Sequence, residues 1–155
     1  LLLDVRMPGP SGLDLQAALP AHKVGLPVIF MTGFADVPTS VRAMKAGAVD
    51  FLEKPVQRQD LLDAIGRALQ RDERQRRERD DMERLQQRFA LLTPREQDVL
   101  EQVVAGKLNK QIATALQVSE RTVKTLRAQG MDKLGATTSA ELGTLMERLR
   151  HGPQA

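Results

Sequence analysis

A run of twelve residues without one apolar side chain, Gln70 to Asp81, divides this chain of 155 residues into two parts. Such a run cannot enter a hydrophobic core, so the folded parts must lie on either side of it. Its mixed charges and strong helix formers predict a solvated helical connector, and a disordered linker is the alternative. We therefore expect three regions: a first domain over 1–69, a charged helical linker over 70–89, and a second domain over 90–155.

Short apolar segments alternate with helical patterns in the first region. The segments predicted as buried strands are Leu1–Val5, Pro27–Met31 and Val49–Glu53. Helices are predicted between them over Leu13–Leu19 and Asp36–Ala46, the second with Asp36 as its N-cap. Strands separated by helices indicate a parallel sheet with crossover connections. A sheet of three strands leaves an exposed edge and an uncovered face.

The last region has a helical pattern throughout. Capping boxes at Thr93–Glu96 and Thr138–Glu141 predict the starts of two helices that run to Ala105 and to about Arg150. Two more helices are expected between them, over Asn109–Leu116 and from the N-cap Ser119 to Leu134. The tight turn at Gln117-Val118 makes this pair a candidate helix-turn-helix.

A helix-turn-helix packs one face of its second helix inward and places another in the major groove of DNA. Val123, Leu126 and Leu134 are predicted to face inward, whereas a solvated face on a small helical bundle is the alternative for the remaining side. Ser119 and Thr122 offer hydroxyl and N–H donors to phosphate. The residues left for the outer faces of this helix are Arg121, Lys124, Thr125, Arg127 and Ala128.

Composition excludes several other classes of protein. The chain has no cysteine, so it forms no disulfide and no thiolate metal site. No nucleophile–base pair or phosphate-binding glycine loop appears, and we expect no enzyme. No apolar run approaches the roughly 20 residues that span a bilayer and no signal peptide is visible, so we expect a cytoplasmic protein without a membrane partner. The net charge is only +3, so nucleic-acid binding would need a local basic patch.

The run from Leu92 to Ala136 resembles the LuxR-type domain of bacterial response regulators, including its TPRE opening and its SERTVK motif. The resemblance implies that the final helix, Ser139–Arg150, is a dimerisation helix. Leu126 and Gly130 depart from the family pattern, and Gly130 is interpreted as a soft spot because glycine costs roughly 1 kcal/mol in a helix. The resemblance implies base contacts from Lys124, Thr125 and Ala128, and phosphate contacts from Lys110, Thr122 and Arg127.

Polar side chains follow the three predicted strands of the first region. Asp4 ends the first strand and precedes a loop with Met7, Thr32 ends the second strand, and Lys54-Pro55 follows the third, which contains Phe51. The carboxyl ends of parallel strands collect ligands at one edge of a sheet. A carboxylate at such an edge can attack phosphorus, while a hydroxyl and an ammonium bind the phosphoryl oxygens.

This segment resembles the C-terminal half of a receiver domain. The resemblance implies that Asp4 accepts a phosphoryl group, that Thr32, Phe51 and Lys54 form the phosphate-binding switch, and that Pro55 follows a cis peptide bond. Mg²⁺ would be bound by Asp4 and the Met7 carbonyl, but these are few ligands, so we expect weak binding of the metal. A receiver of this family has five strands, and we expect this chain to be truncated and to begin at the third.

The expected fold class is α/β, a partial flavodoxin-like receiver with strands three to five, joined by a long helix to an all-α LuxR-type four-helix helix-turn-helix domain. The resemblance implies a two-component response regulator of the LuxR/FixJ (NarL-like) family, in which receiver phosphorylation controls transcription. Its implied partners are double-stranded promoter DNA, a sensor histidine kinase and a second copy in a homodimer. The alternatives are a truncated protein that titrates a longer regulator through mixed dimers, and a sigma-factor-like promoter reader.

Overall fold

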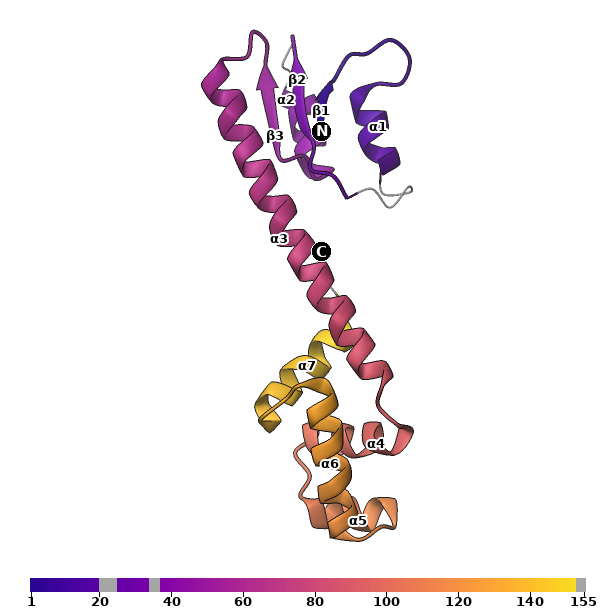
Figure 1. Ribbon diagram of the computed structural model, residues 1–155. Helices are drawn as coiled ribbons and strands as arrows, with labels where there is room; N and C mark the ends of the chain where they lie inside the picture. Colours follow the sequence, from indigo (N-terminus) through magenta and orange to yellow (C-terminus); the bar gives the residue numbers. More distant parts are fainter. Residues whose placement is uncertain (20–24, 34–36, 153–155) are drawn as a thin grey trace. The chain divides into compact units, whose positions relative to one another are not determined.

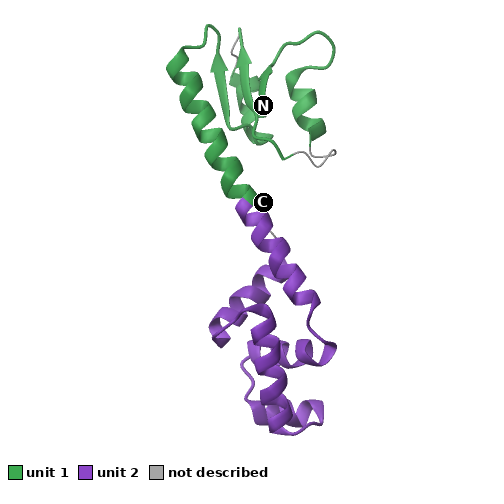
Figure 2. Cartoon of the chain, in the orientation of Figure 1, with its two compact units in different colours: residues 1–76 green, residues 77–155 purple. Residues whose placement is uncertain are grey.

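The computed structural model describes residues 1–19, 25–33 and 37–152. It divides into two compact units, one ending at Arg76 and the next beginning at Arg77 (Figure 2). The boundary lies inside helix α3, Arg58–Ala90, which is one continuous helix. The helical connector expected from the sequence is thus confirmed and a disordered linker is contradicted. None of the helices in the described ranges combines the length and the apolar character needed to cross a bilayer.

The first unit is built on three parallel strands, β1 (Leu2–Asp4), β2 (Ile29–Thr32) and β3 (Asp50–Glu53), in the order β1-β2-β3 (Figure 1). Leu3 pairs with Phe30, and Phe30 pairs with Phe51 on the next strand. Helices α1 (Gly12–Ala18) and α2 (Val37–Lys45) connect the strands. The parallel sheet with helical crossovers predicted from the sequence is therefore confirmed.

The two faces of this sheet are covered by different helices. Phe30 packs with Leu3 and with Ala43 of α2 in one buried cluster. Its neighbour Ile29 points the other way and packs with Ala64 and Ala68 of α3. This alternation is the period of two that a strand imposes on its side chains. The sheet is therefore a thin middle layer, buried on both faces at its centre.

Helix α1 begins with a capping box that the sequence analysis did not predict. Ser11 Oγ accepts a hydrogen bond from the Asp14 N–H at 3.2 Å, and Asp14 Oδ2 accepts one from the Ser11 N–H at 2.9 Å. The N-cap predicted at Asp36 lies outside the described residues.

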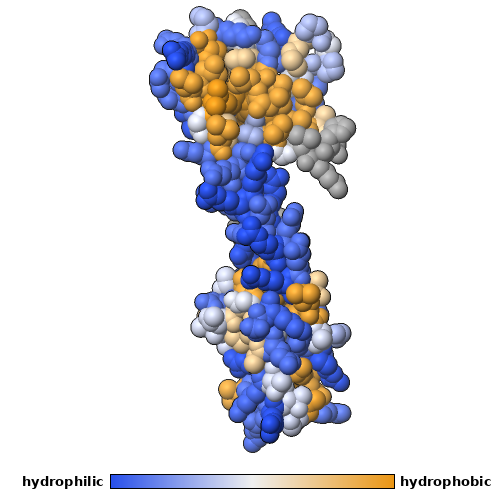
Figure 3. Space-filling view, in the orientation of Figure 1, coloured by the Kyte–Doolittle hydropathy of each residue, from blue (hydrophilic) through white to orange (hydrophobic). Residues whose placement is uncertain are grey.

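Apolar side chains gather on one face of the first unit, whereas the exposed surface of the middle of α3 is hydrophilic (Figure 3). Leu1 and Leu2 at the sheet edge are 44 % and 42 % exposed, and Leu62 and Leu69 on α3 are 50 % and 63 % exposed. Most single apolar side chains on a protein surface need no explanation, but a continuous apolar face marks a site of contact. Strand β1 lies at the edge of the three-stranded sheet, so the exposed edge expected of it is present, whereas α2 and α3 cover opposite faces at the sheet centre and the expectation of an uncovered face is wrong there.

The second unit contains the four helices predicted from the sequence: α4 (Pro94–Val104), α5 (Asn109–Leu116), α6 (Glu120–Leu134) and α7 (Ser139–His151). Each of Thr93, Ser119 and Thr138 accepts a hydrogen bond from the backbone N–H three residues later, at 3.3, 3.0 and 3.1 Å. Gln117 adopts a left-handed conformation with φ of 55° at the turn between α5 and α6. Local chemistry therefore sets these helix ends where the sequence predicts them.

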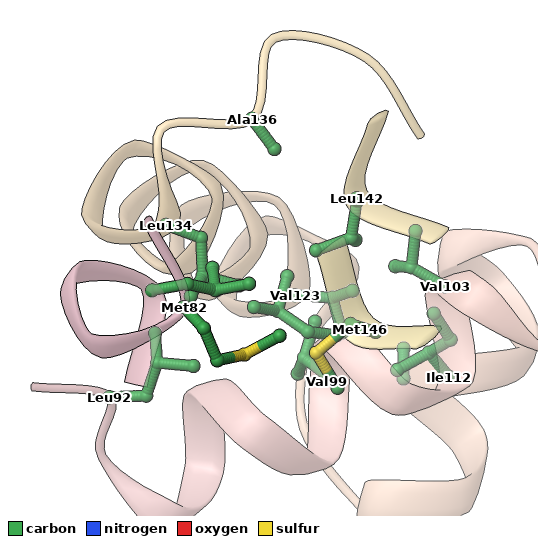
Figure 4. Close-up of a cluster of buried hydrophobic side chains, with 13 residues drawn as sticks. Met82, Leu92, Val99, Val103, Ile112, Val123, Leu134, Ala136, Leu142 and Met146 are labelled. Atoms are coloured by element: carbon green, nitrogen blue, oxygen red, sulfur yellow. The ribbon is translucent and has the colours of Figure 1, made fainter. Parts of the chain in front are cut away.

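One apolar core holds the four helices together (Figure 4). Val99, Leu100, Ile112, Val123 and Leu142 are fully buried in it. Met82 and Leu85, near the end of α3, are each only 5 % exposed and belong to the same cluster. The last turns of the helix expected to be a linker are therefore part of the second unit.

Gly130 of α6 lies against a neighbouring helix. A Cβ at this position would lie 2.9 Å from Leu100 Cδ1 of α4, and Leu100 is fully buried. The glycine lets the two helices approach closely. The glycine therefore has a packing role that the sequence analysis did not predict, and its interpretation as a soft spot stays a prediction.

Candidate nucleic-acid interface and phosphoryl-acceptor site

Helices α5 and α6 and the turn between them form the expected helix-turn-helix. On α6, Val123 is fully buried and Leu134 is 1 % exposed, while Leu126 packs half-buried at the margin of the core. Ile112 of α5 is fully buried beside them. The inward-facing residues predicted for α6 are thus confirmed, and its opposite face is free to meet another molecule.

The exposed face of α6 carries Arg121, Lys124, Thr125 and Ala128. These positions follow the i, i+3, i+4, i+7 spacing that places residues on one side of a helix. Lys110 on α5 is also exposed. Within the part of the chain that the structure describes, neither Lys110, Arg121 nor Lys124 has an ion-pair partner. Their cationic groups are therefore available for an anionic ligand.

The hydroxyl groups at the start of α6 are engaged with each other. Ser119 Oγ caps the helix by accepting from the Thr122 N–H at 3.0 Å, and the two hydroxyl oxygens lie 2.8 Å apart. Thr125 donates its hydroxyl to the Arg121 carbonyl at 3.1 Å. Ser119 and Thr122 are exposed, so they can exchange these bonds for contacts with phosphate at the positive end of the helix dipole.

Arg127 differs from the other basic residues of α6. It is half-buried, and its Nη1 donates to Asn109 Oδ1 of α5 at 3.3 Å while its Nη2 donates to Ser139 Oγ of α7 at 2.7 Å. Both partners are the first residues of their helices. The structure thus joins Arg127 to two other helices rather than to the exposed cationic face.

Sequence reasoning missed a buried ion pair at the other end of α6. Lys133 Nζ lies 2.7 Å from Glu96 Oε2 and 2.9 Å from Oε1, and Glu96 is only 3 % exposed. The hydrogen bond from Lys133, aided by the Thr93 N–H, lowers the pKa of Glu96 below its usual value. The capping box at Glu96 was the available signal, but nothing in it indicated Lys133.

Asp4 and Lys54 come together at the carboxyl edge of the sheet in the first unit. Lys54 Nζ donates to Asp4 Oδ2 at 2.5 Å, and the Arg6 N–H donates to Asp4 Oδ1 at 3.0 Å. The hydrogen bond from Lys54 and then the one from Arg6 lower the pKa of Asp4. Asp4 is therefore an ionised carboxylate with a cation beside it, as attack on phosphorus requires.

Thr32 and Phe51 lie close to this edge. Thr32 is 1 % exposed, and its carbonyl accepts from the Lys54 N–H at 2.7 Å. The Lys54–Pro55 peptide bond is cis. Phe51 is half-buried against Phe30, with ring centroids 6.3 Å apart.

Gly12 holds the loop after β1 against Asp4. The Gly12 N–H donates to the Val5 carbonyl at 3.2 Å. A Cβ on Gly12 would overlap the Asp4 carbonyl oxygen, so only glycine allows this approach. Met7, predicted to offer its carbonyl to a metal, is half-buried in the same loop.

Two family models match the chain. The response regulator receiver domain matches residues 1–66, and the luxR family of bacterial regulatory proteins matches residues 90–146. The receiver match gives no support to the expectation that this domain is truncated in the chain.

Receiver domains generally bind Mg²⁺. Among the described residues, no group of three or more acidic or histidine side chains could hold a metal ion. Asp4 offers one carboxylate, and its Oδ2 is bonded to Lys54. Mg²⁺ needs near-octahedral oxygen coordination. The described residues alone therefore do not fit this ion.

The chain is similar to several known proteins over nearly its whole length. It is 46 % identical to nodulation protein W of Bradyrhizobium diazoefficiens over 96 % of its own residues and 66 % of that protein. It is 45 % identical to the transcriptional regulatory protein FixJ of Azorhizobium caulinodans over 92 % of its residues and 67 % of FixJ. The chain thus spans about two thirds of the length of these curated relatives.

A solved structure, that of the response regulator StyR, is 47 % identical and superposes with a TM-score of 0.82, covering 95 % of this chain and 74 % of StyR. The geometry of both units, the two family matches and these relatives agree. The chain belongs to the response regulators that combine a receiver domain with a LuxR-type helix-turn-helix domain.

Proposed function

We propose that this chain binds double-stranded promoter DNA through α6 and so acts as a transcription regulator of a two-component system. The observation that carries the proposal is the exposed face of α6, where Arg121 and Lys124 have no ion-pair partner among the described residues. A helix-turn-helix reads bases with such a face in the major groove. We expect no enzymatic activity beyond the receiver chemistry, and we place the protein in the bacterial cytoplasm, where its DNA lies.

We further propose that a phosphoryl group on Asp4, donated by a sensor histidine kinase, controls this binding. The supporting geometry is the ionised Asp4 carboxylate beside Lys54, with buried Thr32 on the neighbouring strand. An Asp4 oxygen would attack the phosphorus of a kinase phosphohistidine, the P–N bond would break, and the histidine would leave. Lys54 would then pair with the phosphoryl oxygens instead of the carboxylate.

Homodimerisation through α7 also remains a prediction, which sedimentation of the chain with and without DNA would check.

The experiment that tests DNA binding compares two lysine variants by fluorescence anisotropy. The probes are a duplex enriched by the chain from a random-sequence library and a scrambled duplex of the same composition. Lys124→Ala is expected to lower discrimination between them about tenfold, the order of magnitude of one base contact. Lys110→Ala is expected to weaken both duplexes alike and to reduce the slope of affinity against salt by about one.

Arg95→Ala is the matched control, because it removes one exposed cation on α4, outside the α5–α6 pair. It is expected to leave both affinities unchanged. The proposal would be contradicted if the chain enriched no duplex, or if neither lysine variant changed the DNA affinity.

A second candidate function rests on the apolar side chains that gather on one face of the first unit (Figure 3). Such a surface suits a chain that titrates a longer regulator through mixed dimers. A gel-shift assay separates the two functions, since a titrator need not bind DNA itself. The sigma-factor-like alternative is disfavoured by the receiver match over residues 1–66.

A further inference from the structure

The C-terminal end of α6 is held by a residue from the end of α3. Arg88 Nη1 donates to the Leu134 carbonyl, the last residue of α6, at 3.4 Å. Gly135 caps α6 in a left-handed conformation with φ of 74°. A Cβ on Gly135 would lie only 2.7 Å from Arg88 Nη1, so the guanidinium occupies the space that this glycine leaves open.

A second contact joins the same two ends. Lys133, in the last turn of α6, donates to the Leu91 carbonyl at 3.1 Å, immediately after α3 ends. The same ammonium holds the buried carboxylate of Glu96 at the start of α4. The end of α6 is therefore held by Arg88 and, through Lys133, by Leu91 and Glu96.

Apolar packing supports these polar contacts. Met82, Leu85 and Phe89 lie at i, i+3 and i+7 on α3, and all three pack in the cluster that contains Leu134. Met82 and Leu85 are each 5 % exposed. This stripe packs one side of α3 against the core, and Arg88 therefore lies beside the end of α6.

We propose that Arg88 is a positioning residue for DNA recognition, which clasps the C-terminal end of α6 so that its exposed face meets the bases at a fixed angle. The inference rests on the proposed function and assigns to the end of α3 a part in sequence recognition. A small tilt of α6 would move Lys124 relative to the base edges, whereas contacts to the flexible phosphate backbone would change less. Arg88 therefore acts on specific affinity without touching DNA.

The test compares variants of this chain on the enriched and scrambled duplexes. Arg88→Ala is expected to lower affinity for the enriched duplex about fivefold, the order expected for loss of one ordinary hydrogen bond. Affinity for the scrambled duplex and the salt slope should not change, and Arg88→Lys, which keeps a cationic donor, should recover part of the loss. Arg84→Ala is the control, one turn earlier on α3, where Arg84 pairs with exposed Asp81 at 3.7 Å.

A simple stability role gives a different result. If Arg88 only stabilised the fold, Arg88→Ala would lower both affinities by the same factor, in step with the folded fraction measured by circular dichroism. If Arg88 contacted phosphate, the salt slope would fall by about one. Either result, or no change in specific affinity, would overturn the proposal. If the wild-type chain enriched no duplex, the proposed DNA-binding function itself would be contradicted, and the role of Arg88 in it would fall too.

A double-mutant cycle checks the clasp independently of DNA. Gly135→Ala places a methyl group against the Arg88 guanidinium and also strains a left-handed residue. In the Arg88→Ala background the collision is gone and only the strain remains. Gly135→Ala should speed amide hydrogen exchange in the last turn of α6 in both backgrounds. The increase in exchange rate should be several-fold smaller in the Arg88→Ala background than in the wild type. Equal effects in both backgrounds would show that the contact does not exist.

Discussion

Three basic residues of α6 carry the same charge and have different surroundings. Lys124 is exposed, Arg127 bonds to the first residues of α5 and α7, and Lys133 bonds to buried Glu96. Helical periodicity separates inward from outward positions, but it does not show where a long side chain ends. Arg127 reaches residues 18 and 12 positions away in the sequence. Its contacts depend on how the helices pack, so sequence alone could not distinguish it from Lys124.

Replacement of Arg127 by alanine tests this distinction. Arg127→Ala is expected to destabilise the second unit by about 1–2 kcal/mol, because two interhelical hydrogen bonds are lost. Chemical denaturation followed by circular dichroism measures this change. The slope of DNA affinity against salt should not change, because the guanidinium is not engaged with phosphate. A slope smaller by about one, with unchanged stability, would restore Arg127 to the phosphate contacts that the family resemblance implies.

The acceptor site shows what residue patterns predict well. Asp4 and Lys54 are 50 residues apart in the sequence. Both stand at the carboxyl ends of predicted parallel strands, and this alone predicts that they lie at the same edge of the sheet. The parallel direction of the strands follows from the helical segments between them. The side-chain hydrogen bond that lowers the pKa of Asp4 does not, because it depends on the rotamer of Lys54.

At the scale of elements, helix ends were predicted more accurately than packing. The capping boxes at Thr93 and Thr138 act within four residues, so sequence alone locates the starts of α4 and α7. Each strand begins one or two residues later than predicted, β1 ends one residue earlier and β2 one residue later, since pairing with a neighbour decides where a strand stops. The contact of Gly130 with Leu100 joins two helices thirty residues apart, and no local pattern indicates it.

Gly130→Ala tests the packing of α4 against α6. Alanine would gain about 1 kcal/mol of helix propensity, but crowding a buried leucine costs about 2 kcal/mol. We therefore expect a net loss of about 1 kcal/mol of unfolding free energy, measured by denaturant titration. Gly143→Ala on α7 is the matched control, because nothing lies within 4 Å of its added Cβ. This control should be stabilising, and a gain in stability from Gly130→Ala would show that the two helices are not in close contact.

At the scale of the whole molecule, α3 is shared by both units. Ala64 and Ala68 pack under the sheet, and Met82 and Leu85 pack in the helical core. The sequence shows the charged stretch between them. It does not show that Met82 and Leu85 belong to the core of the second unit, because the residues they meet, such as Leu134, come much later in the chain.

Phosphorylation is tested on the intact chain with acetyl phosphate, Mg²⁺ and mass spectrometry. Phosphate is expected on Asp4 alone, and Asp4→Asn should abolish it. The extent should be small, because Lys54 holds Oδ2 and Asp4 supplies a single carboxylate to the metal. Phosphate on the Asp4→Asn chain would contradict the assignment of Asp4 as the acceptor.

The central claim is that α6 presents its exposed face to DNA. An amide chemical-shift titration of the isotope-labelled chain with the enriched duplex tests it most directly, because it reports every backbone position at once. The largest shifts are predicted over residues 121–128 and at Lys110, with small shifts in the first unit. If the largest shifts fell in the first unit, with residues 121–128 unperturbed, the account would be contradicted.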